Sequence, residues 1–137
     1  MRENVFVPGD RTNRLENLVS EGMPDVNCCL ILGYEVWIEI KSPTEPKRPS
    51  TSLFGSNHNV SQEQKNWFKE QVDAGGRCYF FIDTDRNRFL VHGKWADALN
   101  ELTVAQIREM SKWHASKPMR GLQAQCRALR DCLIAPF

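Results

Sequence analysis

The chain has 137 residues, and its 18 lysines and arginines nearly balance 17 aspartates and glutamates, giving a formal net charge of +1. This length suits one domain that buries its own core without disulfides, and the charge gives little support for nucleic-acid binding by bulk electrostatics. No apolar run approaches the roughly 18 residues that span a bilayer, and the first residues lack the apolar core of a signal peptide. We therefore expect a cytoplasmic protein without membrane contact, in the host cytoplasm if a phage encodes it.

The start of the chain leaves two alternatives open. Residues 1–10 contain Pro8 and Gly9 and predict an irregular arm. Residues 11–22 fit either a short helix or an edge strand, because periodicity cannot decide between them over so few residues.

Two apolar runs on either side of Gly33 predict a β-hairpin. Residues 26–32 form a short apolar run between turn residues, and residues 35–41 alternate between apolar and polar. In the second run Glu39 and Lys41 share one face, so their side chains project together about 6 to 7 Å apart along the strand.

The turn of this hairpin decides where Asp25 lies. A two-residue turn at residues 33–34 with unbroken pairing would place Asp25 on the opposite face of the sheet from Glu39. An odd-length turn, such as a three-residue turn with glycine in the left-handed conformation, or a bulge would place both acids on one face. Unless Asp25 precedes regular pairing, a shared site requires this geometry, and we predict an odd-length turn or a bulge within residues 32–35.

Residues 42–60 form a long segment rich in proline, glycine and small polar residues. Loops longer than about 12 to 15 residues in compact domains tend to be functional or disordered. This segment is expected to be a flexible loop, either a solvated linker or a flap that carries Lys47 and Arg48 and orders against a substrate.

The middle of the chain predicts a helix followed by a second hairpin. Ser61 and Gln64 have the spacing of a capping box, and the helix that they begin should end at the two glycines of residues 75–76. Residues 77–82 and 88–92 then predict two antiparallel strands joined by a turn.

The last third of the chain predicts helices. Residues 95–102 fit a short helix, and residues 103–115 fit a longer one. A final helix carries an apolar stripe at spacings of four, three and four, formed by Leu122, Cys126, Leu129 and Leu133. We divide the chain into a core of residues 1–94 and a helical extension of residues 95–137, which either packs on the core as a lid or forms a dimer surface.

Asp25, Glu39 and Lys41 form the set with the clearest chemistry. Two converging carboxylates can hold Mg²⁺ with water in the remaining positions, which is the open coordination that phosphate substrates require. A nearby lysine positions or deprotonates the attacking water and offsets negative charge in the transition state. Each residue alone has a simpler explanation, because Pro-Asp usually marks a turn and the other two could form a solvated strand face. The set in this order favours a metal-dependent nuclease.

Four segments, GMPDVN, WIEIK, SQEQKNWF and DAGG, resemble the PD-(D/E)XK nuclease superfamily, most closely its VRR-NUC branch and related small phage and bacterial nucleases. The resemblance covers residues 14–92. It implies a restriction-endonuclease-like α/β fold, with a mixed central sheet of about four strands flanked by helices. It also implies a DNA endonuclease that depends on Mg²⁺ or Mn²⁺. The implied site consists of Asp25 and Glu39 as metal ligands, Ile40 as the donor of a backbone carbonyl, Lys41 as the catalytic lysine and Gln64 as the helix glutamine beside them.

The chain departs from the superfamily's pattern at one point, the position of a further acid. Its members usually supply a further acid from an N-terminal helix, whereas only 24 residues precede Asp25 here. Glu16 is the best candidate for that acid, followed by Glu21 and Glu3. Gln64 also has a purely structural alternative, because it is the residue that closes the predicted capping box.

Three functions follow in order of preference. The first is a metal-dependent DNA endonuclease, with branched or otherwise structured DNA as its substrate by analogy with relatives that act like Holliday-junction resolvases; a homodimer would suit such an enzyme. The second is a catalytically inactive nuclease-fold protein that binds DNA or a protein partner. A structural zinc protein fails on spacing, because the five cysteines lack a CxxC pair and the adjacent Cys28 and Cys29 would point to opposite faces of a strand.

Overall fold

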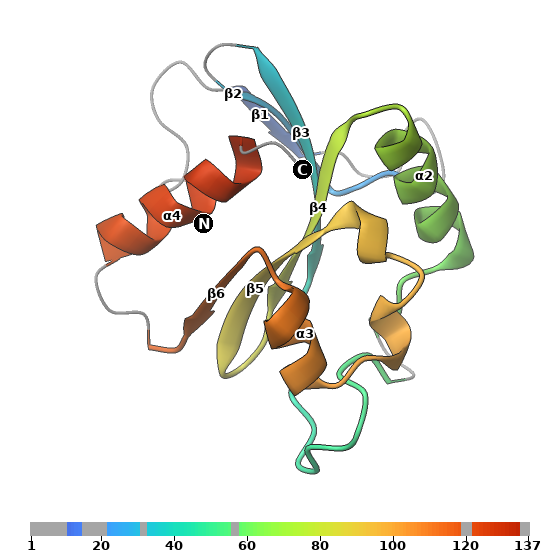
Figure 1. The fold of residues 1–137 in the computed structure, drawn as a ribbon, viewed down its shortest axis with the longest axis vertical. Coiled ribbons are helices and arrows are strands. Elements are labelled where there is room, and N and C mark those ends of the chain that lie inside the picture. Colours follow the sequence, from blue (N-terminus) through green and yellow to red (C-terminus); the bar gives the residue numbers. More distant parts are fainter. Residues whose placement is uncertain (1–10, 15–21, 31–32, 56–57, 119–121, 135–137) are drawn as a thin grey trace.

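A computed structural model describes residues 11–14, 22–30, 33–55, 58–118 and 122–134. These residues form a mixed sheet with helices on both of its faces (Figure 1). The strands are β1 (Arg11–Arg14), β2 (Val26–Leu30), β3 (Tyr34–Lys41), β4 (Arg77–Asp83), β5 (Asn87–His92) and β6 (Trp113–Ser116). The helices are α2 (Gln62–Asp73), α3 (Val104–Met110) and α4 (Leu122–Ile134), with the short 3₁₀ turns η1 (Gly93–Trp95) and η2 (Leu99–Glu101). The predicted α/β class is confirmed.

The sheet has six strands in the order β1-β2-β3-β4-β5-β6, so the expected number of about four is wrong. Only β3 and β4 run parallel, because α2 connects them as a crossover; the other neighbouring pairs are antiparallel. The additional strands are the two edges. At one edge, β1 confirms the strand alternative for residues 11–14, while residues 15–21 lie outside the described part of the chain.

The predicted odd-length turn between β2 and β3 is confirmed. Leu30 pairs with Tyr34, which leaves three residues between them, and Gly33 has a φ of 84°. Glycine adopts this left-handed conformation without the steric cost that a side chain would add. The same register pairs Val26 with Ile38, so the next residue towards the N-terminus, Asp25, lies beside Glu39.

Two apolar clusters cover the two faces of the sheet. On one face Phe68 of α2 stacks on Phe80 of β4 with ring centroids 4.2 Å apart, and Leu53 and Phe54 from the long loop are buried in the same cluster. The prediction of a solvated linker is therefore wrong for this part of residues 42–60. On the other face Cys126, Leu129 and Leu133 of α4 pack against the sheet, with Leu133 fully buried, as the lid alternative requires.

The predicted helix of residues 103–115 is wrong in its second half. Helix α3 ends at Met110, and β6 then pairs with β5 along the second edge of the sheet. Trp113 and Ala115 are buried on alternate positions, which is the two-residue period of a strand. The short helix expected at residues 95–102 is replaced by the turns η1 and η2. The predicted final helix is present as α4, which spans all four positions of the predicted stripe.

No helix within the described ranges is long and apolar enough to cross a membrane.

Candidate active site

The site lies where β3 ends, beside the chain that leads into β2. The backbone N–H of Asp25 donates to Glu39 Oε1 at 3.2 Å, and the backbone N–H of Ile40 donates to Asp25 Oδ2 at 3.2 Å. Both bonds run from a backbone N–H to a side-chain carboxylate just beyond the last paired residues, Val26 and Ile38, and they hold the two carboxylates close together. The predicted convergence of the two acids is thus present in the structure.

Burial and a neighbouring charge make Glu39 an unusual carboxyl group. It is 5% exposed, and burial, followed by the negative charge of Asp25, raises its pKa to about 7. Lys41 and the hydrogen bonds that Glu39 accepts act in the opposite direction and lower this pKa. The protein therefore holds two acids together although their proximity is unfavourable, which is typical of a functional site.

Gln64 connects these acids to the first turn of α2. Its Nε2 donates to Glu39 Oε2 at 2.9 Å, and its Oε1 accepts from Lys41 Nζ at 3.1 Å. The same Oε1 also accepts from the backbone N–H of Ser61 at 3.0 Å, which completes the capping box. Both alternatives for Gln64 are therefore realised in one side chain.

Lys41 lies between the acids and the end of the long loop. Its Nζ is 3.6 Å from Glu39 Oε2 and donates to the backbone carbonyl of Asn59 at 3.1 Å. The lysine side chain is only 11% exposed, so its charge acts in a partly desolvated environment. Asn59 was not singled out from the sequence, because only its backbone oxygen takes part.

Gly22 and Pro24 hold the chain before Asp25 in place. Gly22 has a φ of 83°, and a Cβ there would lie 2.8 Å from the backbone nitrogen of Gln64 and against the carbonyl of Glu63. The backbone of Gly22 therefore packs directly on the first turn of α2, where a larger residue cannot fit. Pro24 is buried, which fixes the bend before Asp25. The role of Gly22 depends on a contact across forty residues and has no local signal beyond glycine itself.

The residues present fit a divalent cation with few protein ligands. Glu39 pairs with Lys41, whereas no ion pair among the described residues involves Asp25, so the site has an excess of acceptor oxygens. The Ile40 N–H points to Asp25, and the carbonyl of a strand residue points to the same side as its N–H, so this carbonyl can serve as a third ligand. Mg²⁺ is commonly bound by one or two carboxylates and keeps several waters.

Within the described residues, the site lacks the third acid that the sequence predicts. Those residues contain no group of three or more histidine, cysteine, aspartate or glutamate side chains that could hold a metal ion. Glu16, the predicted catalytic acid, and the alternatives Glu21 and Glu3 lie outside the described part of the chain. The geometry therefore places Asp25, Glu39, Ile40, Lys41 and Gln64 together and leaves Glu16 as a prediction.

No family model and no curated protein matches this sequence.

Proposed function

We propose that the protein is an endonuclease of the PD-(D/E)XK type, which hydrolyses phosphodiester bonds in DNA with Mg²⁺ or Mn²⁺. The observation that supports this most directly is the proximity of Asp25 and Glu39 at the end of β3, because it places two carboxylates at a site that also holds a partly buried lysine. Lys41 supplies one positive charge for the two acids, which leaves room for a cation.

Each residue then has a defined task. Asp25, Glu39 and the Ile40 carbonyl would hold the cation, which would supply a Lewis acid for the phosphate and a more acidic water. Lys41 positions the attacking water and offsets the negative charge that develops on the phosphate oxygens. Gln64 fixes the relative positions of Glu39 and Lys41 by bonding to both. Water adds to phosphorus, one P–O ester bond breaks, and the leaving oxygen takes up a proton.

A second candidate is a nuclease-fold protein that binds DNA or a protein partner without cutting. It is favoured by one observation, since the described residues supply only two acids to the site. The intact set of Asp25, Glu39 and Lys41 supports the enzyme instead.

The test is to incubate the protein with supercoiled plasmid and with a four-way DNA junction, in Mg²⁺, Mn²⁺ or EDTA. Asp25→Ala and Lys41→Ala should each abolish metal-dependent cutting, whereas Glu109→Ala, which removes an exposed acid on α3, should not. Preferential cutting of the junction would support branched DNA as the substrate. Binding to DNA without cutting under any metal would exclude the enzyme and favour the second candidate.

A further inference from the structure

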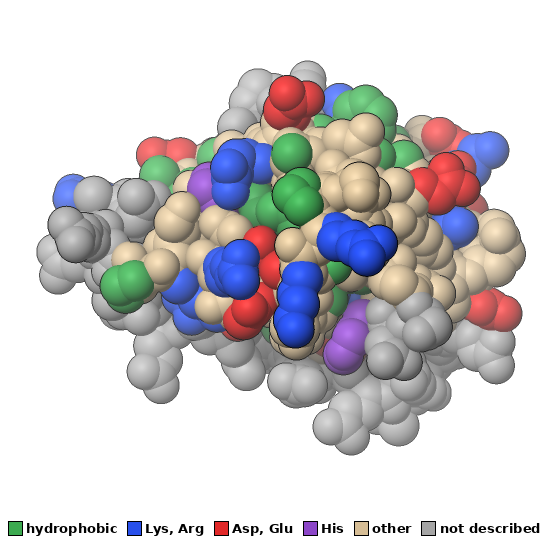
Figure 2. Space-filling view, turned by 90° about the horizontal axis from the view of Figure 1, so that it is seen from below, with side chains coloured by type: hydrophobic (Ala, Val, Ile, Leu, Met, Phe, Trp, Pro, Cys, Tyr) green, Lys and Arg blue, Asp and Glu red, His purple; other side chains and the backbone are tan. Residues whose placement is uncertain are grey.

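The end of the molecule that carries the site also carries a group of exposed cations. Figure 2 shows lysine and arginine side chains around a few acidic ones on the face formed by the long loop and the strand ends. A cavity of about 230 Å³ on the protein surface is lined by Lys47, Arg48, Arg86 and Arg108, together with Glu45. We call these four cations the basic patch. They come from three separate elements: the loop, the turn between β4 and β5, and α3.

The positive charge of the basic patch is mostly uncompensated. All four side chains are exposed, and within the described ranges no acid forms an ion pair with Lys47, Arg48 or Arg108. Arg86 Nε lies 3.8 Å from Asp85 Oδ2, but both side chains are well exposed, so this pair is weak. The cations are therefore available to a ligand.

Glu45 offsets only one of the four cations, because its donors are neutral and its carboxylate keeps a single negative charge. Its Oε2 accepts from Thr84 Oγ1 and from Asn87 Nδ2, both of which are buried. Its backbone N–H donates to Asp85 Oδ1 at 2.9 Å. These bonds also fix the start of the loop against the turn between β4 and β5, so the cations of the two elements are held near each other before any ligand arrives.

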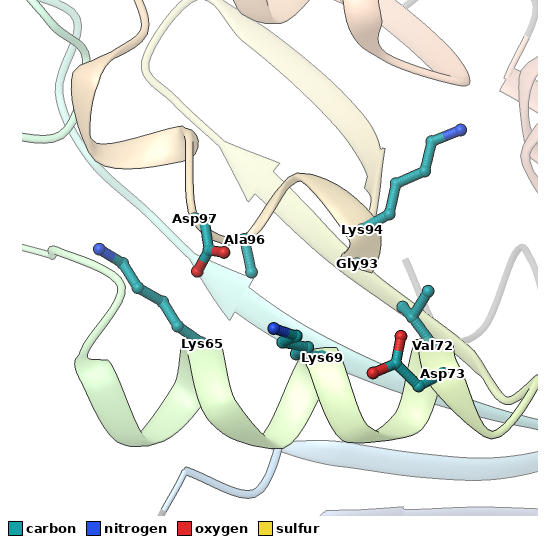
Figure 3. A pocket seen from close by; sticks show the side chains of 8 residues that line it. All are labelled: Lys65, Lys69, Val72, Asp73, Gly93, Lys94, Ala96 and Asp97. Atoms are coloured by element: carbon teal, nitrogen blue, oxygen red, sulfur yellow. The ribbon is translucent and has the colours of Figure 1, made fainter.

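A second cavity makes a useful contrast. The cavity between α2 and η1 has a volume of about 260 Å³ and is lined by Lys65, Lys69 and Lys94 (Figure 3). Asp73 and Asp97 lie among these lysines, so its charge is nearly balanced. The basic patch has the larger excess of positive charge and three arginines, whose planar groups suit bidentate contacts with phosphate.

The basic patch lies close to the site along the chain. Lys47 follows Lys41 by six residues, so their Cα atoms are at most about 20 Å apart. Successive phosphates of one DNA strand are separated by about 3.4 Å along the helix axis, so about six base pairs cover that distance.

We propose that Lys47, Arg48, Arg86 and Arg108 bind the backbone phosphates of duplex DNA, with Lys47 within about six base pairs of the phosphate that is cut at Asp25 and Glu39. This inference rests on the proposed nuclease function, because it identifies the substrate of that site as DNA with a double-stranded arm. The patch contacts backbone phosphates alone, so it supplies affinity and position and does not read sequence.

The test measures binding of a fluorescent duplex in EDTA, where no cutting occurs, over a range of salt concentrations. In Arg48→Ala/Arg108→Ala the affinity at low salt should fall by about tenfold or more, and the slope of log K against log salt should shrink by about two. Arg127→Ala, which removes one exposed cation on α4, is the control and should leave both values unchanged. Unchanged affinity and slope in the double variant, or no binding of the duplex by the unmodified protein, would overturn the proposal.

Cutting assays in Mg²⁺ separate this inference from the proposed function. The unmodified protein should show a lower KM for substrates whose duplex arm exceeds about six base pairs than for shorter arms, and the double variant should lose this preference. Normal cutting with equal KM for both arms would overturn the basic patch and leave the nuclease intact. Patch-dependent binding without any cutting would support the basic patch and exclude the nuclease.

Discussion

The ends of the two parallel strands, β3 and β4, both carry acidic residues, but the ratio of acids to cations differs between them. At the end of β4, Asp83 lies 3.3 Å from Arg88 and also pairs with Lys117, so one acid faces two cations. At the end of β3, Asp25 and Glu39 lie together; within the described residues Glu39 pairs with Lys41, and Asp25 forms no ion pair. The β4 cluster has a cation for its acid and holds strands together, whereas the β3 cluster has more acids than cations among the described residues, which is the arrangement that the proposed metal site requires.

The two clusters lie on opposite faces of the sheet. Lys41 pairs with Ile82, whose side chain is buried on the α2 face, and Asp83, the next residue, points to the α4 face. The site is therefore placed on the face where α2 can contribute Gln64. The comparison teaches that charge balance, more than the presence of acids at a strand end, separates a candidate active site from a structural ion pair.

The largest expected effect tests directly whether the ends of β3 and β4 differ in function. Glu39→Gln should lower the rate of metal-dependent cutting by about a thousandfold or more. The substitution removes the negative charge of a proposed metal ligand, and the cation bound there is the group that would stabilise the phosphate. Asp83→Asn should leave the rate within a few-fold and lower the free energy of unfolding by about 1 kcal/mol, since that cluster is partly exposed. Cleavage assays and urea unfolding of both variants measure these values. Equal loss of cutting in the two variants would contradict the distinction.

Gly22 offers the next largest effect, on both stability and cutting. Gly22→Ala adds a side chain to a left-handed residue that packs on α2, and we expect it to lower the free energy of unfolding by about 2 to 4 kcal/mol and to impair cutting. Gly33→Ala is the matched control, because its φ is also positive but nothing lies within 4 Å of its Cβ position. That variant should cost only about 1 kcal/mol. Similar losses in the two variants, measured by urea unfolding, would show that the contact with α2 is unimportant.

The Tm in Mg²⁺ also distinguishes the end of β3 from the end of β4. A ligand present at about a hundred times its dissociation constant stabilises the folded protein by about 2.7 kcal/mol. Mg²⁺ should therefore raise the Tm of the unmodified protein and of Asp83→Asn, but not that of Glu39→Gln. Scanning fluorimetry with Mg²⁺, with Ca²⁺ and with EDTA tests this, and a Tm increase that persists in Glu39→Gln would place the cation elsewhere.

The smallest expected effect concerns a buried ionisable residue away from the site. Burial, followed by the nearby charges of Lys112 and Lys94, lowers the pKa of His92 to about 4. The unfolded chain binds a proton below about pH 6.5 that the folded protein does not, so stability is full above that pH and falls towards pH 4. We expect a loss of about 1 to 3 kcal/mol over this range.

His92→Asn isolates this contribution. His92 accepts from the backbone N–H of Lys94, and asparagine can accept the same bond. The difference in unfolding free energy between the variant and the unmodified protein should therefore change between pH 7.5 and pH 4.5. A difference that stays constant across this range would show that the folded protein protonates His92 as readily as the unfolded chain.

Features set by neighbouring residues could be predicted from the sequence, whereas features set by distant contacts could not. The odd turn at Gly33 and the start of α2 at Ser61 depend on local geometry, and both were predicted correctly. Strand β6 was missed because an apolar helical spacing continues through His114, while the pairing with β5 that decides the structure comes from more than twenty residues away. The contact of Gly22 with α2 was missed for the same reason.

The oxygen of Gln64 that closes the capping box also holds Lys41, so a single atom belongs both to the start of a helix and to the site. Fraying of the first turn of α2 would therefore remove the contact of Gln64 with Lys41 before the sheet opens, and leave the lysine with only Glu39 and the Asn59 carbonyl as partners among the described residues. Heating should thus reduce the proposed cutting at a temperature below that of global unfolding, because the site would depend on one helical turn as well as on the core.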